Sequence, residues 1–156
     1  RGQRVDTSLV QGVAGQGPYN WFLRVIADRY PDAFNVTPPF SDAGVTEVAT
    51  CPNVVLKLGG IGMPMFGTTW HERDIQPGPD EVAAHWGDAV RSCIDTFGPD
   101  RCMFESNFAV DRISMTYATA WAAFDLISQT YSPAERAALF HDTAVRTYRL
   151  DRQDTA

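Results

Sequence analysis

Apolar residues recur along the chain with two different periods, and segments of the two kinds alternate. Val54–Leu58 and Arg101–Glu105 are short, nearly continuous apolar runs bounded by turn residues, which predicts two buried strands. Between them, Pro79 opens and Gly98-Pro99 closes a segment with helical spacing, which predicts a helix. Its apolar stripe comprises Val82, Trp86, Val90, Cys93, Ile94 and Phe97.

Further helices are predicted on both sides of this unit. One is expected from Tyr19 to Tyr30, where Pro31 follows, and a short one is expected between an N-cap at Ser41 or Asp42 and Pro52. Two more follow the second strand: one carries Tyr117, Trp121, Phe124 and Ile127, and one begins with a capping box at Ser132-Pro-Ala-Glu135 and ends near Leu150. Residues 59–79 and 106–115 are predicted to be loops.

Strands that alternate with helices and are apolar throughout predict an α/β fold with a parallel sheet and flanking helices. Two strands are clear, and two alternatives stay open: either weaker strands lie before Thr50, for example around Val36, or the chain is a partial barrel. A (β/α)8 barrel takes about 250 residues, so a chain of 156 residues can supply only an incomplete barrel.

Composition restricts the classes of partner. A formal charge of −6, a pI of about 4.9 and one lysine, Lys57, argue against nucleic acid. No apolar run approaches the roughly 20 residues of a membrane span, and the N-terminal residues lack the apolar core of a signal peptide, so a cytoplasmic location is expected. The three cysteines, Cys51, Cys93 and Cys102, have no metal-ligand spacing and are predicted to be buried thiols.

Candidate site residues follow the second strand, because reactive groups of parallel β/α folds lie in loops after the strands' carboxyl ends. Glu105, Ser106 and Arg112 are candidates for substrate binding. Asn107 can donate and accept hydrogen bonds but cannot act as a base, so it suits substrate or oxyanion binding. Asp111 is either a base or metal ligand, or a helix cap in a salt bridge with Arg112.

His71, on the first loop, is the third catalytic candidate, as a general base or ligand; its alternative is a plain surface residue. His85 and His141 lie inside predicted helices and are interpreted as structural or solvated. Three histidines this far apart form none of the usual metal signatures, so no complete metal site is predicted in this chain.

Three segments together resemble the amidohydrolase-related family of TIM-barrel hydrolases: CPNVVLKLGGIGMPMFG (51–67), FGPDRCMFESNFAVD (97–111) and ALFHDTAVRTYRL (138–150). The resemblance covers residues 46–150, which are interpreted as a barrel portion after an unassigned segment, 1–45, and before a tail, 151–156. It implies the C-terminal portion of a distorted (β/α)8 barrel that hydrolyses amide, ester or lactone bonds in small carboxylated or cyclic substrates. Some members use a divalent metal, and lactonase-like members manage without one.

The residue-by-residue match shows two departures. Ser106 and Phe108 match a Gly-Ser-Asp-aromatic-Pro pattern of the family, whereas Asn107 stands in the aspartate's place and Ala109 in that of the proline. The family's early H-x-H pair is absent from this chain. Two interpretations therefore stay open: a hydrolase whose remaining barrel supplies the histidines, or an inactive α/β module that self-associates through open barrel edges. A decarboxylase of the same superfamily is a further alternative.

Overall fold

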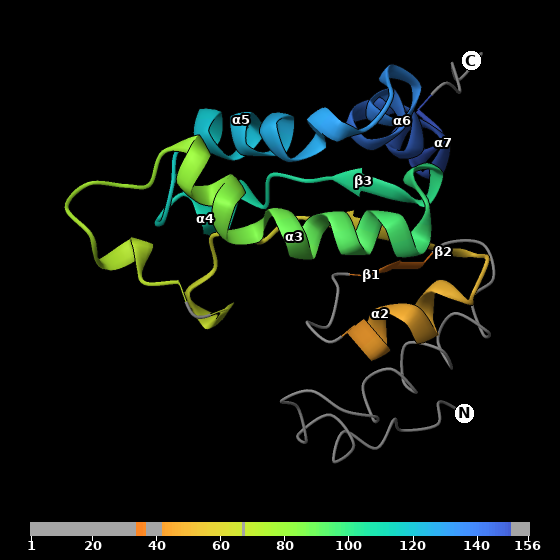
Figure 1. Cartoon of the computed structure of the whole chain (residues 1–156), viewed down its shortest axis with the longest axis horizontal. Coiled ribbons are helices and arrows are strands. Elements are labelled where there is room, and N and C mark those ends of the chain that lie inside the picture. Colours follow the sequence, from red (N-terminus) through yellow and green to blue (C-terminus); the bar gives the residue numbers. More distant parts are fainter. Residues whose placement is uncertain (1–33, 37–41, 67, 151–156) are drawn as a thin grey trace, which may run out of the picture.

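The computed structural model describes residues 34–36, 42–66 and 68–150 (Figure 1). The predicted helix from Tyr19 to Tyr30 lies outside these residues. In chain order the helices and strands are β1 (Phe34–Val36), α2 (Asp42–Ala49), β2 (Val54–Leu58), α3 (Pro79–Phe97), β3 (Cys102–Phe104), α4 (Phe108–Asp111), α5 (Tyr117–Ile127), α6 (Pro133–Ala137), a π-helical segment (Ala138–Asp142) and α7 (Thr143–Tyr148).

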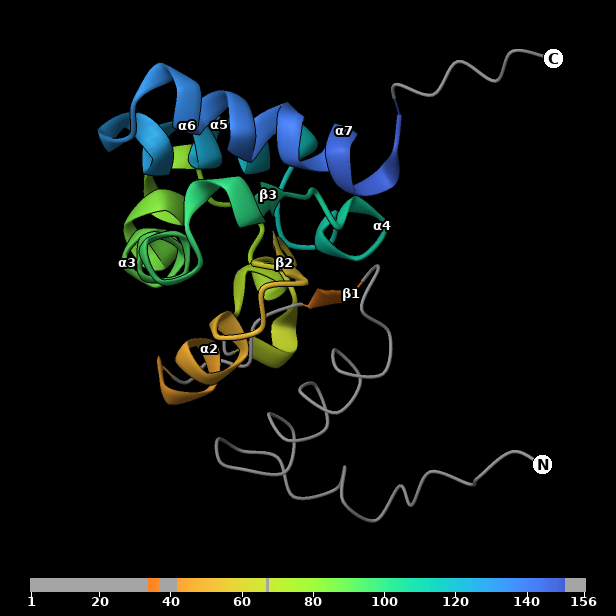
Figure 2. The same cartoon turned by 90° about the vertical axis from the view of Figure 1, so that its right-hand side faces the viewer.

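The three strands form one parallel sheet in the order β1-β2-β3. The prediction of a parallel α/β arrangement is confirmed, and β1 is a strand at the position that one of the two alternatives named, around Val36. Each strand pairs with the next one along the chain, and α2 and α3 supply the two crossovers. Seen roughly along the strands, α2 and α3 lie on one side of the sheet, α4 lies on the other, and α5, α6 and α7 lie beyond β3 (Figure 2).

The core lies between the sheet and its helices. In β2 the buried residues alternate, so that Val54, Leu56 and Leu58 face the helices while Val55 and Lys57 face the other way. The predicted apolar stripe of α3 is confirmed: its residues from Val82 to Phe97 are buried in the same cluster. Burial of one such side chain contributes about 1.5–3 kcal/mol, so the stripe is what fixes α3 against the sheet.

The ends of the helices agree with their predicted signals, with two differences. Pro79 occupies the first turn of α3. Gly98, with a φ of 86°, ends this helix, and the N–H of Gly98 donates to the carbonyl of Ile94 at 2.8 Å. The capping box of Ser132 and Glu135 is present at α6. Residues 106–115, predicted as a loop, contain the one-turn helix α4, and the single C-terminal helix is interrupted by the π-helical segment.

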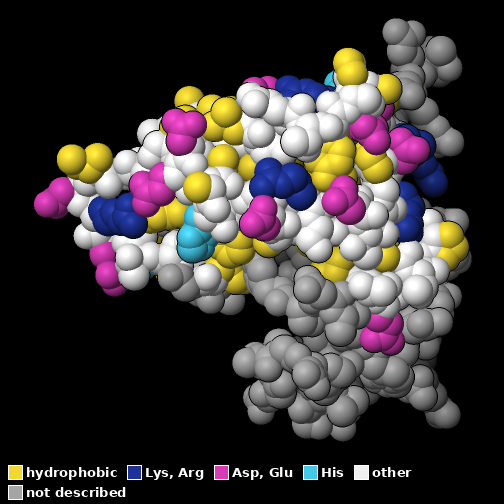
Figure 3. Space-filling view, viewed as in Figure 1, with side chains coloured by type: hydrophobic (Ala, Val, Ile, Leu, Met, Phe, Trp, Pro, Cys, Tyr) yellow, Lys and Arg dark blue, Asp and Glu magenta, His cyan; other side chains and the backbone are white. Residues whose placement is uncertain are grey.

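Both signs of charge are mixed on the face that Figure 3 shows, where basic side chains lie beside acidic ones. Among the described residues, Arg91 pairs with Asp88 at 2.8 Å and Arg136 with Asp125 at 2.6 Å. None of the described helices combines the length and the apolar character that a membrane-spanning segment needs. The three cysteines are buried free thiols, and burial raises the pKa of Cys102 well above its usual range.

Candidate functional site

The loops that follow β2 and β3 begin side by side. Leu58 is in register with Phe104, and the N–H of Glu105 donates to the carbonyl of Leu58 at 3.1 Å, so the sheet pairing continues one residue past β3. Both loops leave the sheet at its carboxyl edge, which lies at the left in Figure 1. The topology therefore gathers the polar residues of both loops at one end of the molecule.

Asn107 sits at the turn between β3 and α4. Its backbone is left-handed, with φ 44° and ψ 28°, a conformation that asparagine tolerates better than most residues. Its carbonyl accepts from the N–H groups of Val110 and Asp111 at 2.9 and 3.0 Å, which starts α4. Its side-chain Nδ2 donates to Oδ1 of Asp111 at 2.9 Å. No described residue donates a hydrogen bond to Oδ1 of Asn107.

Asp111 is the point at which the two loops are joined. It is 1% exposed, and its Oδ2 accepts from the N–H of Gly62, on the loop after β2, at 3.1 Å. A Cβ on Gly62 would lie 3.0 Å from that of Asp111, so this close approach suits glycine. Burial raises the pKa of Asp111; the hydrogen bonds from Gly62 and Asn107 act against that rise, and the charge of Glu105 adds to it.

Glu105 forms an ion pair with Lys57. Glu105 was predicted as a site residue from the sequence, but Lys57 was not. The side chain of Glu105 lies across Gly59, where a Cβ would come within 2.2 Å of Glu105 Cγ. The hydrogen bond to Glu105 raises the pKa of Lys57, and burial acts in the opposite direction. The sequence did carry a signal for Lys57. It is a charged residue inside an otherwise apolar predicted strand, and it is the only lysine in the chain.

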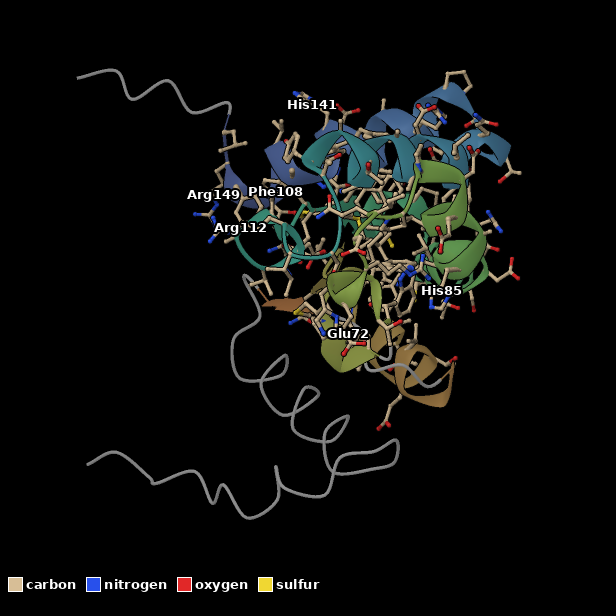
Figure 4. The ribbon with its side chains drawn as sticks, turned by 90° about the vertical axis from the view of Figure 1, so that its left-hand side faces the viewer. Glu72, His85, Phe108, Arg112, His141 and Arg149 are labelled. Atoms are coloured by element: carbon tan, nitrogen blue, oxygen red, sulfur yellow. The ribbon has the colours of Figure 1, made fainter. Side chains whose placement is uncertain are left out.

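Arg112 and Ser106 lie next to Asp111 and Asn107 in the chain but take no part in the side-chain hydrogen bonds described above. Arg112 is exposed; its carbonyl accepts from Gln76 at 3.4 Å, and no described residue contacts its guanidinium group through an ion pair or hydrogen bond. The half-buried Ser106 likewise makes no side-chain hydrogen bond with a described residue. Figure 4 looks onto this end of the molecule and shows Arg112 beside Phe108, on α4.

The alternative reading of Asp111, as a helix cap in a salt bridge with Arg112, is wrong. Asp111 is the last residue of α4, and its carboxylate is turned inward to Gly62 and Asn107 because these donors offset its burial.

His71 is not joined to this pair by any contact between described residues. It lies in a 3-10 turn (Trp70–Glu72), is exposed, and its Nε2 is 3.7 Å from Oε1 of Glu72. Figure 4 shows Glu72 on a different segment from Arg112. The catalytic role of His71 thus stays a prediction. His85 and His141 are exposed on helical segments, which agrees with the interpretation of them as structural or solvated.

The donor set was tested for a metal ion. Among the described residues no three His, Cys, Asp or Glu side chains converge. Asp111 already accepts two hydrogen bonds, and Glu105 is neutralised by Lys57. The described residues therefore do not fit a metal centre by themselves, since such a centre needs three or four convergent ligands.

The chain is similar in sequence to a known protein family and to individual known proteins. The family model described as amidohydrolase matches residues 15–150, a longer stretch than the resemblance covered. An uncharacterised protein, y4mH, of Sinorhizobium fredii is 39% identical over 66% of this chain and 30% of its own length. L-fucono-1,5-lactonase of Burkholderia multivorans is 30% identical over 69% of this chain and 34% of its own length.

Solved structures agree with these sequence matches. Crystal structures of an amidohydrolase from Burkholderia multivorans, one with bound zinc and one with bound HEPES, superpose with a TM-score of 0.59 at 29% identity. Each match covers 69% of this chain and 36% of the other. The chain thus spans about a third of the length of the relatives it matches. On the family match over residues 15–150, the chain belongs to the amidohydrolase family.

Proposed function

We propose that this chain is the C-terminal portion of a (β/α)8 barrel hydrolase. The described strands are parallel neighbours in sequence order, with crossover helices on one side, as in a (β/α)8 barrel. Three strands are three-eighths of such a barrel, close to the 30–36% of its relatives that the chain spans. The predicted barrel portion, residues 46–150, omits β1, which pairs with β2 in the same sheet; the proposal therefore counts β1 with the barrel and leaves 151–156 as a tail.

The proposed reaction is hydrolysis of an ester, lactone or amide in a small carboxylated or cyclic substrate. Water attacks the acyl carbon, the bond from that carbon to the leaving oxygen or nitrogen breaks, and the water proton passes to the leaving group. The relative named L-fucono-1,5-lactonase supports a lactone among these substrates. Decarboxylation is the less supported alternative, because the named relative is a lactonase.

One observation carries the proposal: Asn107 lies at the carboxyl edge of the sheet, where barrel hydrolases do their chemistry, and its amide is hydrogen-bonded to a buried carboxylate. Its left-handed backbone and its bond to the buried Asp111 fix the amide at two points. The remaining N–H of Nδ2 can then donate to the acyl oxygen as negative charge develops on it. Asp111 positions this amide, and its raised pKa makes it a better base than an ordinary aspartate.

Other roles complete the proposal. Arg112 and Ser106 would bind polar groups of the substrate at the rim, where the exposed guanidinium of Arg112 presents several hydrogen-bond donors. A divalent metal, if the whole barrel uses one, needs ligands from outside the described residues. A small molecule rather than nucleic acid or membrane as partner, and a cytoplasmic location, also stay predictions.

Kinetics on the longer form of the protein test the role of Asn107. Asn107→Gly keeps the left-handed backbone while removing the amide, so kcat/KM for a lactone and ester panel should fall more than about tenfold, or 1.4 kcal/mol. Asp88→Asn, at a fully exposed position on α3, is the control and should leave the rate unchanged. Unchanged kinetics in Asn107→Gly would remove this residue from the site.

The alternative function is a non-catalytic module that associates through its sheet edges. The observation in its favour is that β1 and β3 each have a single strand partner among the described residues. Reading the genomic sequence upstream for a strand with an H-x-H pair separates the two proposals, since only a hydrolase needs that strand.

A further inference from the structure

The Lys57–Glu105 ion pair lies on the sheet face that points away from α2 and α3. Strand alternation sends Lys57 to this face, because its neighbours Leu56 and Leu58 are in the helix-side core. In a closed barrel this face is the interior, and Lys57 lies one residue before the carboxyl end of β2. An ion pair here faces the space in which a substrate would bind.

The pair is held in place from both strands and still has unused hydrogen-bonding capacity. Gly59 leaves room for Glu105 to lie across β2, and Glu105 turns back to the ammonium group of Lys57. The two side chains are 30% and 21% exposed. An ammonium group has three donors and a carboxylate about four acceptor sites, and the described residues form one bond between them. A donor and an acceptor are therefore presented side by side.

The local charges disfavour an anion at this point. An anion on Lys57 would also approach Glu105 and, beyond it, Asp111, whose pKa the Glu105 charge already affects. Among the described residues, Tyr148 is the other titratable group whose charge acts on Lys57. The positive charge of Lys57 is thus cancelled locally. A hydroxyl group fits better, because it donates to Glu105 while it accepts from Lys57.

We propose that the Lys57–Glu105 ion pair is a hydroxyl-binding subsite that selects a neutral, polyhydroxylated ring over an anionic substrate. This inference rests on the proposed function and narrows its substrates to hydroxylated lactones. Lys57 touches the substrate in this scheme, and Gly59 is required because it admits the Glu105 side chain.

The test uses the longer form of the protein, in which the barrel interior can be complete. Lysine is labelled with 13C at Cε, and the resonance of Lys57 is identified by its loss in Lys57→Arg. The probes are 1,5-anhydroglucitol, a neutral ring with hydroxyls; tetrahydropyran, the same ring without them; and tetrahydropyran-2-carboxylate, an anion without them. We expect a saturable shift with 1,5-anhydroglucitol alone.

Two variants complete the experiment. Glu105→Gln keeps the side-chain shape but loses the charge, so binding of 1,5-anhydroglucitol should weaken about tenfold, as for one charge-assisted hydrogen bond. Glu81→Gln breaks the exposed pair with Arg73 and should bind as the parent does. A shift that follows the carboxylate probe, equal weakening in both variants, or no shift with any probe would overturn the inference. Absence of lactone hydrolysis with the expected shifts would instead count against the proposed function alone.

Discussion

Asp111 is a carboxyl group that folding removes from water, and its two hydrogen bonds offset only part of that cost. The residue is 1% exposed, and burial is the main reason that its pKa is raised. The polar cluster after β3 could be predicted from the sequence because strand ends collect functional groups. The link from Asp111 to Gly62 could not, because its donor is a backbone N–H 49 positions away.

The raised pKa of Asp111 makes stability depend on pH. Its folded pKa lies above the unfolded value of about 4, so between the two values the folded state binds more protons, and this contribution to stability is lost as pH rises. Relative to Asp111→Asn, the wild type should therefore lose unfolding free energy from about pH 4 upward, by about 1.4 kcal/mol for each pH unit between the two pKa values. Urea unfolding at several pH values measures this, and a difference that is flat or has the opposite sign contradicts it.

Gly59 determines whether Glu105 can reach Lys57. In Gly59→Ala the new Cβ would lie 2.2 Å from Glu105 Cγ and 2.5 Å from its carbonyl oxygen, so the backbone of β3 must shift. Overpacking of this kind costs about 1–3 kcal/mol. The control is Gly78→Ala, since Gly78 has a φ of −81° and nothing within 4 Å of the added Cβ, and its change should stay within about 0.5 kcal/mol. Equal stability of the two variants by denaturant unfolding would argue against the packing described at Gly59.

At the scale of elements, Arg101, which directly precedes β3, connects this strand to two helices through hydrogen bonds. Its Nε donates to the carbonyl of Phe97 at the end of α3, and its terminal nitrogens donate to the carbonyls of Ala49, the last residue of α2, and of Cys51, each at 3.0 Å. The guanidinium also lies 5.2 Å from the centre of the Phe97 ring. Phe97 and Ala49 are the last residues of α3 and α2, where carbonyls lack partners within the helix, so one side chain binds the ends of both crossover helices.

Arg101→Lys should destabilise the fold although the charge is kept, because a lysine ammonium cannot match the planar fork that reaches three carbonyls. Loss of two of these hydrogen bonds predicts about 2–3 kcal/mol. Arg73→Lys, at an exposed ion pair with Glu81, should cost less than about 0.5 kcal/mol. Thermal and urea unfolding of both variants provide the comparison, and similar losses in the two would contradict the role of Arg101.

The elements themselves were predictable where local signals and packing agree. The α3 stripe, its Pro79 start and its Gly98 end all indicate the same helix, and the structure has it. The helix α4 has four residues and forms around the left-handed Asn107, a tertiary arrangement without periodicity to detect. Tyr117, predicted on the apolar side of α5, is 50% exposed, while Ala120 and Ala123 are buried in its place. Small residues at a helix contact carry little hydrophobic signal, which explains this error.

At the scale of the whole molecule, the core between the sheet and helices α2 and α3 is well packed. The opposite face of the sheet needs further chain to complete its cover. Helices α2 and α3 cover one side (Figure 2), and each outer strand has one partner within the described part of the chain. Unpaired strand edges favour pairing with another chain. The isolated chain should therefore self-associate, with a light-scattering mass that rises with concentration and an unfolding midpoint that rises with it. A monomer of constant mass that melts cooperatively would count against an incomplete barrel, because such a chain would have to satisfy both edges by itself.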